Sequence, residues 1–425
     1  MRFLYSLLLL LGTPFVLLYF VLRGVRDQSY FSRWSERFGF LTDTAPQEGV
    51  LLHAASVGEV NAASPLIRAL LKAHPELPLT VTTLTPTGSD RLRQEFGDKV
   101  FNSFIPIDLP WAVSRFLNRL KPRLIIIIET EIWPNLYLHA KTKNIPLIMV
   151  NARLSARSRD RFGLLSGFTE TVLGSVSWVG AQTADDAQRL IDCGAKAEHT
   201  CMTGNLKFDL VIPDGLQEKG RVLRSRWSAQ RPVLVAGSTH EADENVLLPA
   251  FIELLKILPD ALLILVPRRP ERFNRVIQAA KDAGLATELR CQREMCSEGA
   301  QCFVIDALGE LMTYYACADI AFVGGSIGDQ GGHNALEPAA LGKPVLMGPN
   351  MPNAREIADQ LLGCNAARQV SNSSELQQAA ELILNDADLR KQMGQSAQAL
   401  VESNKGALNT SLQAINKYLQ AGTLQ

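Results

Sequence analysis

Short apolar runs, each followed by a stretch of helical character, constrain the fold of this chain most. The clearest run is Leu124–Ile128, five consecutive apolar residues with no polar residue between them. A strand that is apolar on both sides must be covered on both faces, which is typical of parallel sheets. Because the same alternation recurs along the chain, the sequence predicts a doubly wound α/β architecture.

The alternation falls into two series separated by Lys207–Gly220, a stretch that contains Pro213 and Gly215. With 425 residues, the chain is too long for one ordinary core. We therefore predict an N-terminal domain over 27–212 and a C-terminal domain over 213–425, whose terminal helix is free to pack back on the first. The predicted strands are Val50–Ala54, Leu79–Thr83, Leu124–Thr130, Pro146–Asn151, Trp178–Gln182 and Thr200–Thr203, then Val233–Ala236, Leu262–Val266, Cys302–Asp306, Ile320–Val323 and Pro344–Met347.

The N-terminal run Phe3–Leu22 has twenty residues without a charge, about the length that crosses a bilayer as a helix. No small-x-small cleavage site follows it, and Arg23 and Arg26 come directly after, so an uncleaved membrane anchor over 1–26 is favoured over a signal peptide. Gly12 and Pro14 leave open a bent helix that lies partly in one leaflet. The basic flank favours a cytoplasmic body.

Composition excludes several classes of function. Lys plus Arg and Asp plus Glu both number 43, and no nucleic-acid-binding module is recognisable, so no nucleic-acid partner is expected. The seven cysteines form no Cys-x-x-Cys, which indicates buried thiols in a reducing compartment. Without a paired Cys/His motif, no metal site is expected.

Acidic residues follow two predicted strands of the first series. In His53-Ala54-Ala55-Ser56-Val57-Gly58-Glu59, Ser56 can cap a helix, Gly58 permits a tight turn, and Glu59 falls in the first helical turn. Glu59 either complements the helix dipole or acts as a general base for a hydroxyl. Glu129 and Glu131, at the end of the strand that begins at Leu124, belong to a solvated loop or to a functional site.

Basic residues could hold an anion beside these carboxylates. Arg153 opens a cluster with Arg157, Arg159 and Arg161, which is either an ordinary solvated helix or a site for phosphate or carboxylate. Lys207 lies in Gly204-Asn205-Leu206-Lys207-Phe208-Asp209, at the end of the first domain.

The second series carries a glycine-rich loop of the kind that binds nucleotides. Gly324-Gly325-Ser326 leads to Gly331-Gly332-His333-Asn334-Ala335-Leu336-Glu337-Pro338, where a strand is followed by a helix whose N-terminus favours phosphate. Gly237-Ser238 and Pro267-Arg268 also follow strands. Neither a Walker A loop nor a dinucleotide-binding fingerprint is present, which disfavours ATPases and dehydrogenases.

Four motifs together resemble the 3-deoxy-D-manno-octulosonic acid (Kdo) transferases of lipopolysaccharide biosynthesis. They are the segments 53–59, 129–135, 204–209 and 331–338 described above. The resemblance covers nearly the whole chain. It implies a GT-B fold, with two Rossmann-like domains facing a cleft, and inverting transfer of Kdo from CMP-Kdo to the 6′-hydroxyl of a tetra-acylated lipid A precursor.

The resemblance also assigns residues. It implies that Glu59 is the general base and that Glu129 and Glu131 form a second acidic motif, with Ser56, Gly58, Arg153 and Lys207 as possible anion contacts. The implied CMP and donor contacts are Gly237, Ser238, Pro267, Arg268, Leu308, Gly309, Glu310, Asn334, Ala335, Leu336 and Glu337. Ala335 stands where some relatives carry proline.

The implied partners are CMP-Kdo, the lipid A precursor and the cytoplasmic face of the inner membrane, with no cofactor and no metal. Two alternatives stay open. One is another nucleotide-sugar enzyme of the same fold, such as a lipid A disaccharide synthase-like transferase or an epimerase. The other is a membrane-tethered nucleotide-sugar-binding protein without catalysis.

Overall fold

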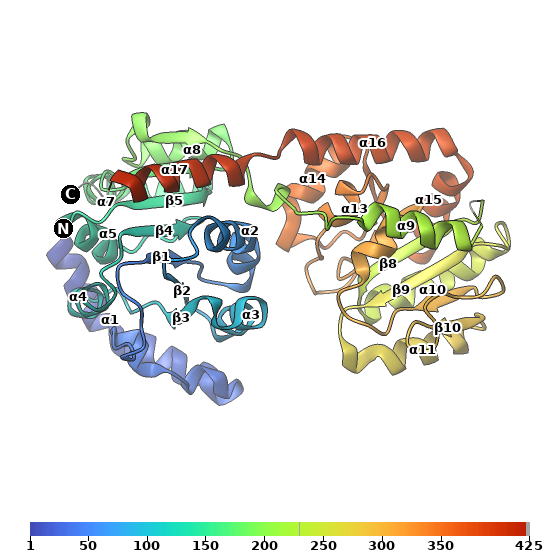
Figure 1. The fold of residues 1–425 in the computed structure, drawn as a ribbon, viewed down its shortest axis with the longest axis horizontal. Helices are drawn as coiled ribbons and strands as arrows, with labels where there is room; N and C mark the ends of the chain where they lie inside the picture. The colour runs from blue at the N-terminus through green and yellow to red at the C-terminus, as the bar shows by residue number, and fades with distance from the viewer. Residues whose placement is uncertain (229, 422–425) are drawn as a thin grey trace. The chain divides into compact units, whose positions relative to one another are not determined.

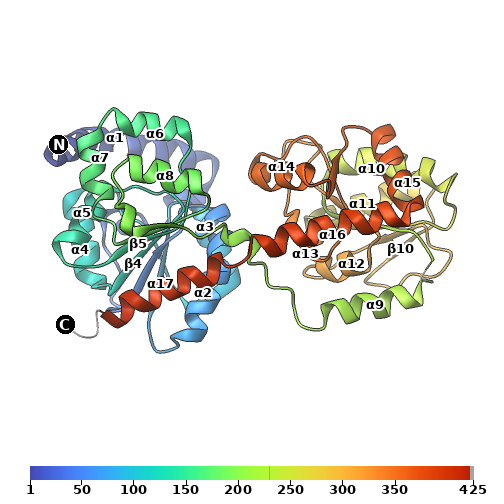
Figure 2. The ribbon, with the colours of Figure 1, turned by 90° about the horizontal axis from the view of Figure 1, so that it is seen from above.

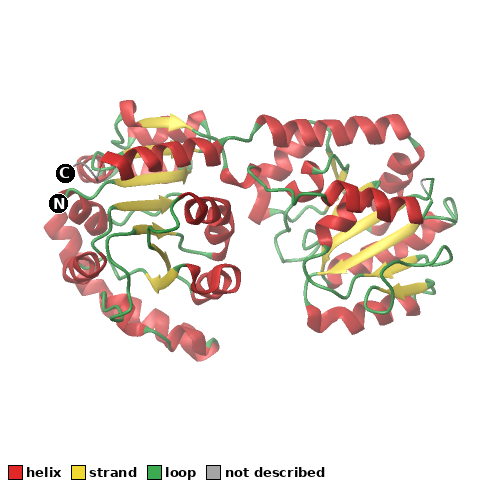
Figure 3. Cartoon of the chain, viewed as in Figure 1, coloured by secondary structure: helices red, strands yellow, loops and turns green. Residues whose placement is uncertain are grey.

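The computed structural model describes residues 1–228 and 230–421, which form two compact units (Figure 1). Unit 1 consists of Met1–Asp209 together with the C-terminal segment from Lys405 onward, and unit 2 of Leu210–Asn404. Each unit contains one seven-stranded sheet in which every strand pair is parallel. Helices cover both faces of each sheet (Figure 3), which confirms the doubly wound α/β prediction.

The unit 1 sheet has the strand order β3-β2-β1-β4-β5-β6-β7. Every residue of β4 is buried, as its continuous apolar sequence predicts. The strands are β1 (Val50–His53), β2 (Leu79–Thr83), β3 (Phe101–Phe104), β4 (Leu124–Ile128), β5 (Leu147–Ala152), β6 (Trp178–Ala181) and β7 (Thr200–Met202); the α-helices are α1 (Arg2–Arg26), α2 (Val57–Ala73), α3 (Pro86–Phe96), α4 (Pro110–Leu120), α5 (Pro134–Thr142), α6 (Ala156–Gly163), α7 (Ser166–Leu173), α8 (Ala184–Asp192) and α17 (Ala407–Ala421).

The unit 2 sheet has the order β10-β11-β9-β8-β12-β13-β14. Its strands are β8 (Val233–Thr239), β9 (Leu262–Pro267), β10 (Thr287–Leu289), β11 (Cys302–Val304), β12 (Ile320–Val323), β13 (Val345–Met347) and β14 (Ala367–Gln369); its α-helices are α9 (Leu216–Arg226), α10 (Glu241–Leu255), α11 (Phe273–Asp282), α12 (Leu311–Cys317), α13 (Leu336–Ala340), α14 (Arg355–Gly363), α15 (Ser373–Asn385) and α16 (Ala387–Ser403).

The sequence missed three of the four outer strands and misplaced some helix starts. β3, β10 and β14 were not predicted, because each has three or four residues and half-exposed polar positions that resemble loop sequence. The helix predicted after the glycine-rich loop is the short α13, which begins at Leu336, where the N–H donates to Asn334 Oδ1. Helix α9 occupies part of the stretch read as a linker.

The N-terminal apolar run forms one helix, α1, with Pro14 inside it. Its segment Arg2–Val25 is long and apolar enough to cross a membrane, judged by length and composition.

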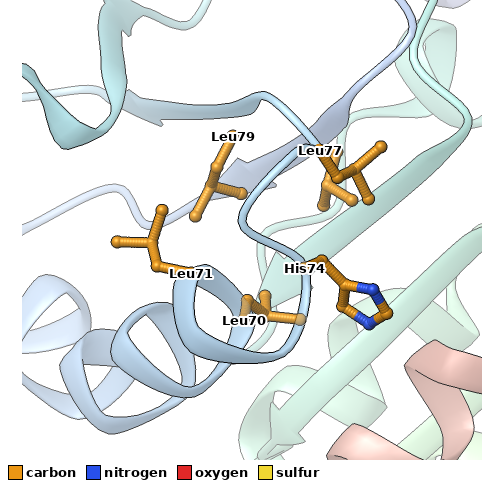
Figure 4. A pocket seen from close by; sticks show the side chains of 6 residues that line it. Leu70, Leu71, His74, Leu77 and Leu79 are labelled. Carbon is orange, nitrogen blue, oxygen red and sulfur yellow. The ribbon is translucent and has the colours of Figure 1, made fainter.

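Helix α17 returns to unit 1 and lies beside α2 (Figure 2). Ala407, Ile415 and Leu419 are buried in the same core as β1 and β4. His74 pairs with Asn416 of α17 at 2.7 Å, beside a small apolar hollow at the amino ends of β1 and β2 (Figure 4). Since ligands of doubly wound sheets bind at the carboxyl ends of the strands, this hollow lies at the wrong edge to be a substrate site.

One carboxylate fixes the start of α17. Asp209, the last residue before the chain enters unit 2, accepts hydrogen bonds from the N–H groups of Gly406 at 2.8 Å and Leu408 at 2.7 Å. Two otherwise unpaired amides at a helix start are thereby satisfied.

We expect Asp209→Ala to destabilise unit 1 by about 1–2 kcal/mol, because the first turn of α17 loses its capping carboxylate. Urea unfolding followed by circular dichroism measures the change. Asp214→Ala, an exposed aspartate in the following segment, is the matched control. Equal midpoints for the two variants would show that the cap contributes nothing.

Candidate active site

Glu59 sits where β1 passes into α2. Ser56 caps α2, and the Glu59 side chain folds back so that Oε2 accepts from the Ala55 N–H at 2.5 Å and Oε1 accepts from Ser56 Oγ at 3.2 Å. This is close to a capping box, in which a serine and a glutamate three residues later satisfy the free amides of a helix start. The predicted turn is therefore confirmed, and the carboxylate is held in one orientation.

Burial sets the charge state of Glu59. It raises the pKa of the carboxyl to about 7, the Ala55 N–H opposes the rise, and the negative charges of Glu131 and Glu129 add to it. A carboxylate with a pKa near neutrality can take up and release protons under physiological conditions. Capping a helix and exchanging protons are therefore compatible in one side chain.

Glu131 and His53 lie side by side next to Glu59. The Glu131 Oε2 atom is 4.0 Å from His53 Nε2, and burial raises the pKa of Glu131 while lowering that of His53 to about 4. His53 is therefore a neutral imidazole, whose Nδ1 contacts Thr82 Oγ1 at 3.0 Å. Trp133 meets the imidazole edge-on, with ring centroids 6.4 Å apart.

The backbone is strained at the ends of two neighbouring strands. Glu129 after β4 and Asn151 in β5 have φ values of 58° and 59°, a region that residues other than glycine seldom adopt. Such strain tends to occur at functional sites, where the surrounding structure enforces it. Asn151 Oδ1 accepts from the Leu206 N–H, while its Nδ2 is buried without a hydrogen-bond partner.

The predicted anion contacts of unit 1 lie in three segments, which follow β1, β5 and β7. Arg153 is exposed, and its backbone N–H and carbonyl both pair with Thr130 Oγ1, which ties the loop after β4 to the loop after β5. Lys207 is half-buried, in the segment that Asn151 holds through Leu206. Ser56 and Gly58 stay beside Glu59, with Gly58 exposed.

In unit 2, Asp243 joins two loops at the carboxyl edge. Its fully buried carboxylate accepts from the N–H groups of His240 at 2.9 Å, Gly325 at 2.7 Å and Ile327 at 3.2 Å. The turn after β8 and the glycine-rich loop after β12 are therefore fastened together. Asp243 was not predicted from the sequence. Its position three residues after His240, at the start of α10, is the sequence feature that could have indicated it.

Two histidines stack at this junction. His240 Nε2 lies 2.9 Å from His333 Nε2, and burial lowers the pKa of both rings, that of His333 to about 4. At His240 the charge of Asp243 opposes this lowering, while Arg269, Arg272 and Arg268 add to it; Arg268 adds to it at His333 as well. Neutral imidazoles beside an exposed arginine leave the positive charge available for an anionic ligand.

Glu337 lies in the same group. Burial raises the pKa of its carboxyl, while Asn334 Nδ2, which donates to Oε1 at 3.2 Å, and the charge of Arg268 oppose the rise. Gly237 leaves room for the buried Tyr315 hydroxyl, which a Cβ at that position would strike. Gly237 and Ser238 do not follow the strand as predicted but lie within β8, which extends to Thr239; Ser238 has a φ of 55° at the register shift between Gly237 and Thr239.

The remaining predicted donor contacts differ in burial and in their hydrogen-bond partners. Pro267 ends β9 and Arg268 follows it, while Ala335 and Leu336 are buried at the start of α13. Leu308 is exposed and Gly309 has a φ of 85°. Glu310 forms an ion pair with Arg290 at 2.8 Å and accepts from Tyr314, so its carboxylate is already occupied within unit 2.

Among residues 1–228 and 230–421, no group of three or more His, Cys, Asp or Glu could hold a metal ion.

Comparison with known proteins shows to which family this chain belongs. The family model of the 3-deoxy-D-manno-octulosonic-acid transferases matches residues 32–210, and that of the group 1 glycosyl transferases matches residues 239–400. The 3-deoxy-D-manno-octulosonic acid transferase of Haemophilus influenzae is 40% identical over 422 residues, which cover 99% of each chain. This chain belongs to the Kdo transferase family. The Bordetella pertussis enzyme is 34% identical over 90% of this chain and 91% of its own.

Membership in the Kdo transferase family confirms the predicted resemblance and the glycosyltransferase activity. A solved structure, the UDP-GlcNAc 2-epimerase of Neisseria meningitidis, has a TM-score of 0.55 and covers 87% of this chain and 100% of its own. At 14% identity the likeness concerns the fold alone. It confirms the GT-B class, with two Rossmann-like domains.

A neutral replacement tests the cost of burying Glu59. We expect Glu59→Gln to raise the urea midpoint at pH 8, because the folded state must bury an ionised carboxylate there. A raised pKa makes this cost appear as pH rises from the unfolded value near 4.5 to about 7. The advantage should vanish at pH 4. An equal difference at both pH values would contradict the burial argument.

Proposed function

We propose that this chain transfers Kdo from CMP-Kdo to the 6′-hydroxyl of a tetra-acylated lipid A precursor, with inversion, at the cytoplasmic face of the inner membrane. Family membership supports the Kdo group as the transferred sugar. The observation that carries the mechanism is Glu59, a carboxylate fixed by the Ala55 amide and given a pKa of about 7. α1 is the proposed means of membrane association.

In this mechanism Glu59 accepts the proton of the acceptor hydroxyl as that oxygen bonds to the anomeric carbon of Kdo. The bond from this carbon to the CMP phosphate oxygen breaks, and CMP leaves with the electron pair. One displacement inverts the configuration. Glu131 acts on Glu59 through its charge, which raises the pKa of the base.

The donor is proposed to bind at the carboxyl edge of the unit 2 sheet. Arg268 offers a charge for the phosphate, and the Glu337 carboxylate can accept from ribose hydroxyls. Gly325, Gly331 and Gly332 have positive φ values, which other residues rarely adopt, and the N–H groups of Gly325 and Gly332, bonded to Asp243 and to the Gly325 carbonyl, hold the loop in this shape. Because CMP-Kdo carries one phosphate, we propose that an arginine suffices without a metal or cofactor.

Replacing the proposed base separates binding from chemistry. Glu59→Gln retains the shape of the side chain but cannot accept a proton. We expect Kdo transfer to fall at least 100-fold, while CMP binding, measured by calorimetry, stays within about twofold. Transfer is measured by mass spectrometry of the lipid product. Near-normal turnover in this variant would rule out Glu59 as the base.

The pH profile should show the same group. Because the ionised form of Glu59 is active, kcat/KM should rise with pH through about 7 and then level off. In Glu131→Gln the inflection should move to lower pH, since a neighbouring negative charge has been removed. An unchanged inflection in that variant would show that the two carboxylates are not coupled.

Charge removal tests the donor site. Arg268→Gln should weaken CMP binding about tenfold or more, the value of a lost charge-assisted hydrogen bond. Arg275→Gln, an exposed arginine on α11, is the matched control and should bind normally. Equal loss in both variants would indicate a general charge effect instead of a phosphate contact.

A further inference from the structure

Helix α1 has an inner stripe and an outer face of opposite character. Buried or half-buried positions recur every three or four residues, as one face of a helix requires. The outer face is exposed and apolar over the whole length of the helix. The inner stripe includes Arg2, Tyr5, Ser6, Thr13, Phe20 and Gly24, and the outer face Phe3, Leu4, Leu7, Leu8, Leu10, Leu11, Phe15, Leu18, Leu22 and Val25.

The start of α1 is attached to unit 1 by polar contacts. Tyr5 donates to Asp108 Oδ2 at 3.0 Å, and Arg2 Nε donates to Asn135 Oδ1 at 3.1 Å. Ser6 pairs with the same amide, and both partners are buried. Asp108 follows β3 and Asn135 opens α5, so this attachment lies on the carboxyl-end side of the sheet.

The end of α1 is attached to the same unit. The ring of Phe20 lies 4.3 Å from the guanidinium carbon of Arg37, which is 4.2 Å from the ring of Phe104 on the other side. Arg37 is buried, and its Nη1 donates to the Leu84 carbonyl just beyond β2. A Cβ on Gly24 would strike the Phe31 ring, so the helix is closely packed there. This second attachment also lies at the carboxyl ends of the strands.

These two attachments are incompatible with a helix that crosses a bilayer. Tyr5 and Phe20 are about 22 Å apart along α1, yet both contact unit 1. A spanning helix would carry Arg2, Tyr5 and Ser6 across the roughly 30 Å hydrocarbon layer and away from Asp108 and Asn135. The inner stripe would then expose its polar groups to lipid.

A basic hairpin continues the apolar face of α1. Tyr5 packs against Phe168 of α7 at 5.6 Å, and the turn before α7 exposes Leu164 and Leu165. Helix α6, which ends at this turn, buries none of its side chains and presents Arg157 and Arg161 to the outside. Figure 2 shows α1, α6 and α7 on one side of the unit 1 sheet and α17 on the other. Apolar residues flanked by arginines complement an anionic lipid surface.

We propose that α1 lies in the plane of a single leaflet, still docked along unit 1, and that its outer face with the Leu164–Leu165 turn forms one lipid-facing surface. This inference rests on the proposed membrane association of α1 and deepens it. The surface is on the carboxyl-end side of the sheet that carries Glu59 and Glu131. A lipid acceptor would therefore approach the proposed base from the side of the sheet on which α1 lies.

Membrane topology provides the first test, with a protease site placed before Met1. In inverted membrane vesicles, the site should be cut from the same side on which the exposed native Cys291 reacts with an impermeant maleimide. Cleavage only from the opposite side would overturn the proposal. Neither result depends on Kdo transfer, so a failure of this membrane proposal can be told apart from a failure of the proposed reaction.

Depth measurement provides the second test. With Cys291 replaced by serine, spin labels are attached to Phe3→Cys, Leu11→Cys and Leu22→Cys in vesicles of neutral and anionic phospholipid. The three labels should lie at equal, shallow depth. A middle label markedly deeper than both end labels would indicate a spanning helix, and label-to-label coupling between two chains would indicate a second copy as the occupant; either overturns the proposal.

Charge insertion tests the hairpin part of the surface. Leu165→Glu should weaken binding to the same vesicles at least threefold, whereas Ile257→Glu, at a similarly exposed residue of unit 2, should leave it unchanged. Equal vesicle binding by the two variants would remove the Leu164–Leu165 turn from the proposed surface. Circular dichroism of both variants establishes that they are folded.

Discussion

In a fully parallel sheet every strand ends at the same edge, and this constraint governs the protein. A strand such as β4 is buried on both faces, so groups that meet a substrate come from the segments that follow the strands. Glu59, Glu131 and His53 gather at such an edge in unit 1, and Asp243, His240 and Arg268 in unit 2. The chemistry of each unit follows from that geometry.

Burial shifts pKa values at the carboxyl edges of both sheets. In unit 1 it raises the pKa of two neighbouring carboxyls, and the short hydrogen bond from Ala55 limits the rise at Glu59. In unit 2 burial keeps two stacked histidines neutral, so that Arg268 supplies the local positive charge. The proposed transfer assigns proton acceptance to the first edge and anion binding to the second.

The fold was largely predictable because its signals are local. Continuous apolar runs specified the central strands, and Ser56 and Glu59 specified the start of α2. Edge strands such as β3 were missed because pairing with a neighbour, and not their own sequence, makes them strands. At the site, the motifs indicated Glu59 and Glu337, but Asp243 and the Glu310–Arg290 pair arise from contacts distant in sequence.

The sequence alone determined the two α/β series, the apolar N-terminal helix and the family, since each depends on residue types at fixed spacing. Only the tertiary structure decided the properties of individual groups. The pKa of Glu59 depends on burial and on Glu131, which lies 72 positions away in the chain. The orientation of α1 along unit 1 likewise depends on its contacts with Asp108 and Arg37, because folding, and not the composition of a helix, sets its neighbours.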